Sequence, residues 1–283
     1  MKIKKRKIVI TISSIVILVL AVAFFLSPYS TALLKSKSHF IKHAKNEIVF
    51  YEPGAEDYAD SIASHLQEAI ERVEQIHGLT FEDSFNIYVC KTQQSFNEFA
   101  VITSTYPIRG TALLGDVFIA PSAFNFRGLD THKETLIHEL SHLHFQQRLG
   151  FIDRRKLPVW FSEGFADFAA GSGGEGIEDS EAINFILSGN HFIPEEEGDI
   201  LGTVKGAAND LSGPMFHQQS KMFVTYIIES DSLKFNSFIL EIQEGEPFSE
   251  TFNKIMGTSI QDKWENFLLQ LKIRKSVNQN LLN

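Results

Sequence analysis

The segment His138-Glu139-Leu140-Ser141-His142 constrains this chain more than any other part of its sequence. Residues four apart on an α-helix lie on one face, so His138 and His142 can direct their imidazole nitrogens at the same cation. Residues 131–149 contain neither Gly nor Pro, and Gly150 ends the run, so the pair is expected in the middle of a helix. Buried histidines with a glutamate between them would be costly without a metal ion or other partners, and the pattern favours zinc.

Glu139 is the expected general base of such a site. It lies one position from the histidine face, and a zinc-bound water needs a nearby carboxylate to accept its proton. The third ligand must come from another segment, because Phe145 and Arg148 occupy the positions where a longer zinc motif would have glycine and a third histidine. Glu163, 21 positions after His142, is the candidate. His144 lies off the ligand face and is expected to be structural.

A second short helix is predicted at 158–170, because Pro158 suits a first helical turn and Gly171 suits a stop. Glu163 and Asp167 lie one turn apart on it, facing the same way. One carboxylate can then bind the metal while Asp167 accepts a hydrogen bond from the free ring nitrogen of a ligand histidine. The alternative for Asp167 is an ordinary solvated helix charge.

These two segments, H-E-L-S-H and W-F-S-E-G-F-A-D, resemble the gluzincin group of zinc peptidases, specifically its peptidase MA-like bacterial branch. The resemblance implies an α+β, zincin-like fold, with a small mixed sheet subdomain before the motif helix and a helical subdomain after it. It implies one Zn²⁺ held by His138, His142 and Glu163, with Glu139 as base and acid and Asp167 orienting a histidine. The implied substrate is a peptide or protein.

Two further site predictions follow from the same resemblance. The family places an edge strand before the motif helix, where it pairs with an extended peptide, so Val117, Phe118, Ile119 and Ala120 are expected to bind the substrate backbone. A plain structural edge strand is the alternative. His217 stands where the family's Y-x-Q-S segment usually has tyrosine, and its imidazole could equally donate a hydrogen bond to the oxyanion. A structural role near a helix start is the alternative for His217.

The N-terminal region predicts a membrane anchor. The 19 residues from Ile8 to Leu26 carry no charge, which suffices for a helix of about 30 Å across the hydrocarbon layer. Five basic residues in positions 2–7 favour a cytoplasmic N-terminus and an extracytoplasmic catalytic domain in a single-pass protein of the cell membrane. Four lysines between positions 35 and 45 weaken this charge bias. A cleaved signal peptide is the alternative.

The remaining pattern divides the chain into a basic segment and anchor at 1–27, a linker at 28–46, the peptidase domain at 47–272 and a frayed tail at 273–283. Within the domain, strands are expected at 48–51, 85–90 and 116–120, and helices at 55–77 and 92–102. The Gly-rich and acidic stretch 171–214 is expected to be an irregular surface segment, which either frames the cleft or is inert. Three or four amphipathic helices are expected in 215–272.

Composition limits the partners. The net charge is −9, and because the first seven residues contribute five positive charges, the rest of the chain carries −14. An acidic body without a basic stripe is not expected to bind nucleic acid. The sequence pattern favours neither a monomer nor an oligomer. Two functions remain beside protein hydrolysis: a membrane-anchored extracellular binding or scaffold protein that keeps the fold without catalysis, and a peptidase of cell-wall cross-links, which would use the same chemistry.

Overall fold

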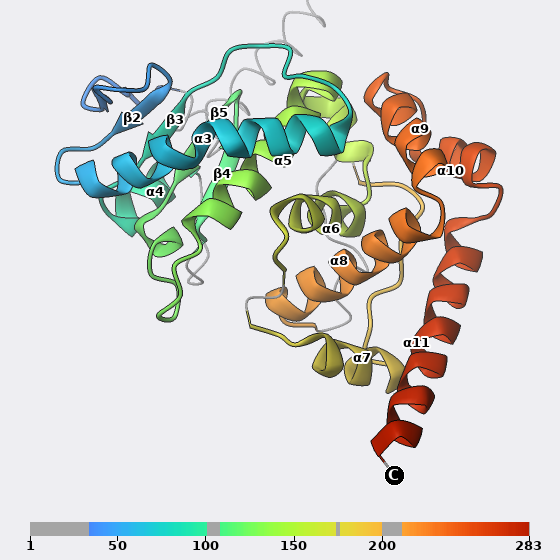
Figure 1. The fold of residues 1–283 in the computed structure, drawn as a ribbon. Helices are drawn as coiled ribbons and strands as arrows, with labels where there is room; N and C mark the ends of the chain where they lie inside the picture. The colour runs from blue at the N-terminus through green and yellow to red at the C-terminus, as the bar shows by residue number, and fades with distance from the viewer. Residues whose placement is uncertain (1–33, 101–107, 174–175, 200–210, 283) are drawn as a thin grey trace, which may run out of the picture.

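The computed structural model describes residues 34–100, 108–173, 176–199 and 211–282 of the chain. The described residues form a five-stranded sheet with its covering helices, followed in the chain by a group of packed helices (Figure 1). The predicted α+β architecture is therefore confirmed at this level.

The sheet has the strand order β1-β2-β3-β5-β4. Its strands are β1 Ile41–Lys42, β2 Val49–Tyr51, β3 Ile87–Val89, β4 Gly110–Leu113 and β5 Asp116–Ile119. Strands β2, β3 and β5 run parallel, whereas β1 is antiparallel to β2 and β4 is antiparallel to β5. The hairpin between β4 and β5 turns through Leu114 and Gly115, which both have positive φ (57° and 86°), as a type I′ hairpin turn requires.

The two faces of the sheet are covered by different helices. Helices α3 (Glu56–His77) and α5 (His132–Asp153) share one apolar cluster with one face, and α4 (Gln93–Ala100) lies on the other. Alternate residues of each strand point to opposite faces of the sheet, so β2, β3 and β5 contribute side chains to the clusters on both faces. Ile87 and Val89 pack with α3 and α5, while Tyr88 packs with the aromatic residues of α4.

The predicted linker 28–46 is wrong in its second half, because the described residues from 34 onwards belong to the folded body. Phe40 is buried, and its ring packs edge-on against Tyr88 and Phe99 at centroid distances of 5.0 and 5.4 Å. Strand β1 lies in the same segment. This part of the fold is not visible in the sequence, because a single buried phenylalanine and a two-residue strand leave no periodic pattern.

The helical part is built from α6 (Val159–Ala170), α7 (Asp179–Leu187), α8 (Gly213–Ser230), α9 (Ser232–Gln243), α10 (Phe248–Met256) and α11 (Ile260–Leu282). Its core is mainly aromatic, with Trp160, Phe161 and Phe165 of α6 at the centre. Four helices from Gly213 onwards agree with the three or four predicted.

Two predictions about this part are wrong. Helix α7 interrupts the stretch 171–214 that was expected to be irregular, because Ala182 and Ile186 are four apart and both buried. Helix α11 continues to Leu282, through the residues expected to form a frayed tail. In α7, the acidic and glycine-rich composition of the stretch concealed a helix that packing stabilises.

The predicted anchor, residues 8–26, lies outside the described residues. Among the helices that the structure does describe, none has the length and apolar character needed to cross a bilayer.

A pair of buried histidines lies between α3 and α5. The His77 Nε2 atom is 2.9 Å from Ser141 Oγ, and its ring centroid is 4.2 Å from that of His144. His144 Nε2 donates to the Leu79 carbonyl at 2.9 Å, so His144 points away from His138 and His142, as expected for a structural residue. Burial, reinforced by His144, holds the pKa of His77 well below its ordinary value.

The contribution of His77 to stability should therefore fall as the pH drops below about 6.5, because the unfolded His77 imidazole binds a proton there and the folded one does not. The expected slope is at most about 1.4 kcal/mol per pH unit for each histidine kept neutral. Urea unfolding of the wild type and of His77→Gln at pH 7.5 and 5.5 measures it. The variant should lose less stability on acidification, and equal losses in both proteins would contradict the prediction.

Candidate metal centre and active site

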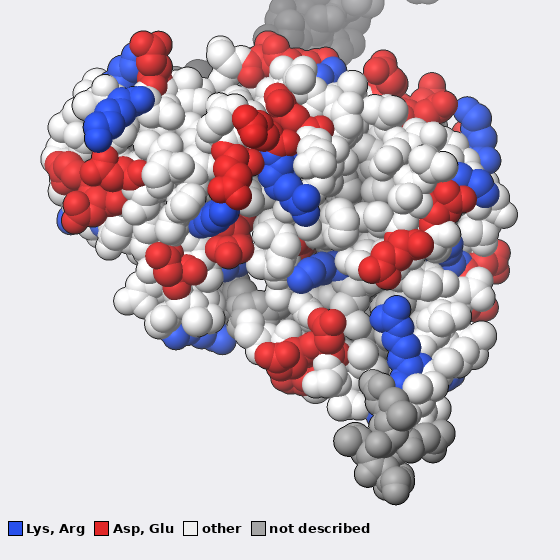
Figure 2. Space-filling view, viewed as in Figure 1, with Lys and Arg blue, Asp and Glu red and all other residues white. Residues whose placement is uncertain are grey.

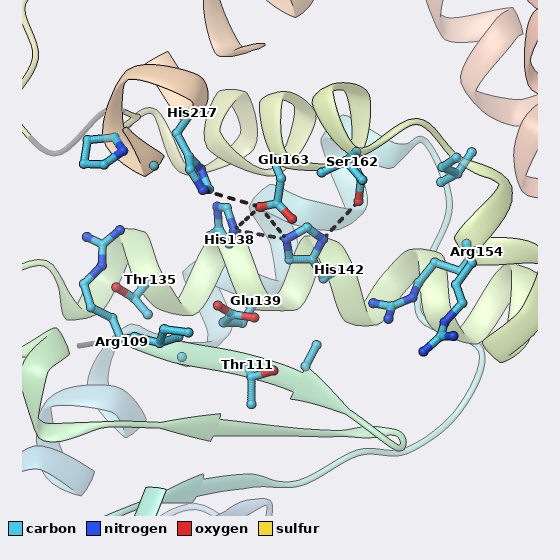
Figure 3. Close-up of a pocket in the computed structure, with 18 of the residues that line it drawn as sticks. Arg109, Thr111, Thr135, His138, Glu139, His142, Arg154, Ser162, Glu163 and His217 are labelled. Atoms are coloured by element: carbon cyan, nitrogen blue, oxygen red, sulfur yellow. Dashed lines mark hydrogen bonds and ion pairs between the residues drawn. The ribbon is translucent and has the colours of Figure 1, made fainter. Parts of the chain in front are cut away.

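Helix α5 carries the histidine pair and Glu139 toward α6. Gly150 interrupts α5 with a positive φ of 70°, a conformation that residues with a Cβ atom rarely adopt. The chain then turns and continues into α6. Helix α6 packs against α5 and brings Glu163 over the histidine face (Figure 3). Glu163, 21 positions after His142, thus meets the two predicted histidine ligands in one place.

The three donor atoms form a nearly regular triangle. His138 Nε2 and His142 Nε2 are 3.0 Å apart, and each is 3.3 Å from Glu163 Oε2. A tetrahedral zinc ion with bonds of about 2.0–2.1 Å separates its donor atoms by about 3.3 Å. Two imidazole nitrogens and one carboxylate oxygen at these separations fit three zinc ligands and leave a fourth position for water.

Outer partners fix the orientation of both ligand histidines. His138 Nδ1 donates to Asp167 Oδ1 at 2.9 Å, and His142 Nδ1 donates to Ser162 Oγ at 3.3 Å. With both Nδ1 atoms occupied in this way, each Nε2 is directed at the donor triangle. The buried Asp167 side chain thus lies where the sequence places it, and the solvated alternative does not hold.

Asp167 also contacts His217, which the sequence did not indicate. Its second oxygen, Oδ2, accepts a hydrogen bond of 2.8 Å from His217 Nδ1. The other nitrogen of that ring, Nε2, lies 4.0 Å from Glu163 Oε2. One carboxylate therefore aligns two imidazoles, one in the donor triangle and one beside it.

The electrostatics of the cluster favour positive charge. Burial alone would lower the pKa of His138, but the surrounding carboxylates, Asp167 first, outweigh burial and hold that pKa well above its ordinary value. Burial would raise the pKa of Glu163, but the neighbouring imidazoles, His142 first, hold it well below its ordinary value. The pKa of Asp167 is lowered against burial in the same way. The carboxylates are therefore ionised, and a divalent cation would supply the positive charge that they attract.

The glycine that follows Glu163 allows α6 and α8 to cross in direct contact. A Cβ atom on Gly164 would lie 2.5 Å from the backbone oxygen of Ser220, much closer than such atoms approach each other. The backbone of Gly164 is helical, so the requirement is for space and not for an unusual φ. This close crossing places the start of α8, and with it His217, next to the donor triangle (Figure 3).

A cavity of about 540 Å³ opens onto the donor triangle. Strand β4 forms one wall, α5 and α6 form the floor, and the start of α8 closes one side. Arg109 lies at one end of the cavity and Arg154 at the other, with Glu139 between them (Figure 3). Asp199, at the end of the described range 176–199, also borders it.

The predicted substrate strand is wrong in one respect, because β5 is not an edge strand. Val117, Phe118 and Ile119 lie between β3 and β4, paired on both sides, and Ala120, which directly follows β5, is buried. Within the described part of the chain, β4 is the strand at this edge, and it borders the cavity.

The pairing of β4 shows which of its backbone groups face the open edge. Ala120 N donates to the Arg109 carbonyl, and in an antiparallel ladder such pairs alternate, so Thr111 also bonds toward β5. Gly110 and Ala112 therefore direct their N–H and C=O groups away from β5. The sequence concealed β4 because glycine and alanine are weak strand formers, whereas the apolar run in β5 is a strong signal.

Comparisons with known proteins find similar solved structures but no matching family model. No family model matches the sequence, and no curated protein matches it. The structure is similar to native yeast LTA4 hydrolase, with a TM-score of 0.46 and 14% identity over 78% of this chain and 37% of that one. It is also similar to yeast LTA4 hydrolase in complex with bestatin, with a TM-score of 0.45 and 13% identity over 73% and 34%. The chain thus spans about a third of the length of these structures.

Proposed function

We propose that the protein is a zinc-dependent peptidase that hydrolyses peptide bonds with Glu139 as its general base. The donor triangle of His138, His142 and Glu163, open to a cavity that also contains Glu139, is the observation that carries this proposal. Zinc in a site with three protein ligands lowers the pKa of a bound water toward neutrality and polarises a carbonyl group.

Each other part of the mechanism belongs to a residue of the chain. The edge of β4, at Gly110 and Ala112, offers backbone groups to an extended substrate. Glu139, largely buried beside that strand, accepts the proton of the attacking water and transfers it to the leaving amine. Asp167 holds His138 and His217 in fixed orientations.

His217 is proposed to stabilise the negative charge that develops on the carbonyl oxygen. Because its Nδ1 is bonded to Asp167, its Nε2 is available on the side of the donor triangle. Removing one such donor typically costs about 10²–10³ in kcat. His217→Ala should therefore lower kcat by that factor while retaining zinc, and His217→Tyr should recover part of the loss because a phenol can also donate. Full kcat in His217→Ala on a cleaved peptide would overturn the assignment.

We also propose that residues 8–26 anchor the enzyme in the cell membrane, with the catalytic domain outside. The uncharged run and the basic residues before it support this placement. Nucleic acid is not a proposed partner: on the face shown in Figure 2, acidic and basic side chains are interspersed, and the chain is acidic as a whole.

The function is tested with the full-length protein, purified in detergent and incubated with a mixed-peptide library and with cross-linked cell-wall peptides. Cleavage should occur, stop on addition of a zinc chelator and return with added Zn²⁺. Cleavage of the cell-wall peptides alone would assign the same chemistry to that substrate. Zinc binding without cleavage of either substrate would contradict the proposal and favour the scaffold function.

A further inference from the structure

Gly110 of β4 is in direct contact with the proposed base. A Cβ atom at this position would lie 2.7 Å from Glu139 Cγ, 3.1 Å from Glu139 Oε1 and 2.9 Å from Thr135 Cγ2. Cβ atoms in proteins essentially never approach other heavy atoms more closely than 3.0 Å. The backbone of Gly110 is not left-handed, so glycine is needed here for space alone.

The same residue also borders the proposed substrate. Gly110 pairs with Ile119 in the ladder between β4 and β5, and its own N–H and C=O face the open edge. Thr135 and Glu139 lie one helical turn apart on α5, and the side chains of both lie against Gly110. Helix α5 thus approaches the strand closely at this point, and the Glu139 carboxylate lies beside the edge where an extended peptide would pair.

From this contact we infer that Gly110 is a positioning residue, whose missing side chain determines where the Glu139 carboxylate lies relative to the substrate edge. The inference rests on the proposed peptidase function for its catalytic consequence, but not for the contact itself. A methyl group at position 110 must displace Glu139, Thr135 or the strand. A displacement of about 1 Å in a catalytic site can reduce turnover about 10²-fold.

A thermal-unfolding cycle tests the contact independently of activity, in the full-length protein. Gly110→Ala should lower the Tm by about 3–10 °C, as overpacking of a tight contact does. The same substitution in a Thr135→Ser, Glu139→Ala background should lower it by much less, because the obstructing Thr135 Cγ2 and Glu139 Cγ and Oε1 atoms are gone. Gly213→Ala is a control for the added methyl group, since its new Cβ would meet nothing within 4 Å, and its Tm should fall by less than that of Gly110→Ala.

The cycle remains decisive if Gly110→Ala alone does not fold. A triple variant that also carries Thr135→Ser and Glu139→Ala and folds would support the contact, and a triple variant that fails although its Thr135→Ser, Glu139→Ala background folds would overturn it. Equal Tm losses in the two backgrounds would overturn it as well.

Kinetics and metal content test the positioning role. Gly110→Ala should keep one zinc per chain and lose about 10² in kcat with little change in KM, because the new methyl group faces α5 and not the substrate. In a Glu139→Gln background it should cause no further loss. Wild-type kcat in Gly110→Ala would refute the role. If the wild type cleaves no peptide, the proposed function fails, while the thermal cycle still decides the contact.

Discussion

Replacing Glu139 with glutamine should reduce peptide hydrolysis by about 10²–10⁴-fold and leave zinc bound. Glutamine fits the space between Gly110 and Thr135 but cannot accept a proton from water, so only proton transfer is lost. Glu139 Oε1 and Cγ lie against β4 and outside the triangle of His138, His142 and Glu163, so the metal ligands are unchanged. Initial rates on a cleaved peptide and zinc content per chain measure both parts of the prediction.

Glu134→Gln is the matched control for this experiment. It makes the same chemical change in the first turn of the same helix, away from the cavity, and it should keep wild-type rates. An active Glu139→Gln variant, with rates close to those of the control, would show that another group accepts the proton and that the proposed mechanism is wrong.

Replacing Glu163 with glutamine should cause the largest loss of zinc affinity among the substitutions near the donor triangle. Glu163 Oε2 is 3.3 Å from both imidazole Nε2 atoms and supplies the negative charge of the site. Glutamine removes this charge and leaves only a neutral amide oxygen, a weaker zinc ligand than a carboxylate. The loss should exceed the about 10–100-fold effect typical of an outer partner. Competition with a chromophoric chelator measures the Kd directly.

Two other variants give this prediction a graded control. Asp167→Asn should weaken zinc binding by about 10–100-fold, because the carboxylate that orients His138 is lost. Ser162→Ala should have a smaller effect, because its 3.3 Å contact with His142 is long and uncharged. The increase in Tm on adding zinc should therefore be largest for Ser162→Ala, smaller for Asp167→Asn and smallest for Glu163→Gln. A Glu163→Gln variant that binds zinc as tightly as Ser162→Ala would exclude Glu163 from the ligand set.

The sequence predicted what depends on short spacing. His138 and His142 are four residues apart, so helix geometry alone places them on one face, and Glu163 and Asp167 repeat this relation on the next helix. The structure brings the two pairs together. This meeting depends on the packing of α6 against α5. In the sequence, only the family resemblance and the helix break at Gly150 indicate it.

Contacts between distant segments were not predictable in this way. The bond between Asp167 and His217 joins residues 50 positions apart. Gly164 and Gly110 look like ordinary glycines in the sequence, and their importance depends on Ser220 and Glu139, which only the folded chain brings near. The edge strand, β4, lacks β-branched residues except Thr111, whereas β5 contains Val117 and Ile119, so the sequence pattern favours β5 over the strand that lies at the edge.

Anomalous scattering at the zinc absorption edge, measured on crystals of the zinc-loaded protein, tests the central claim most directly. The account predicts one strong peak about 2.0–2.2 Å from His138 Nε2, His142 Nε2 and a Glu163 carboxylate oxygen. A peak elsewhere, or no peak with the Glu163 carboxylate turned away from both imidazoles, would contradict it.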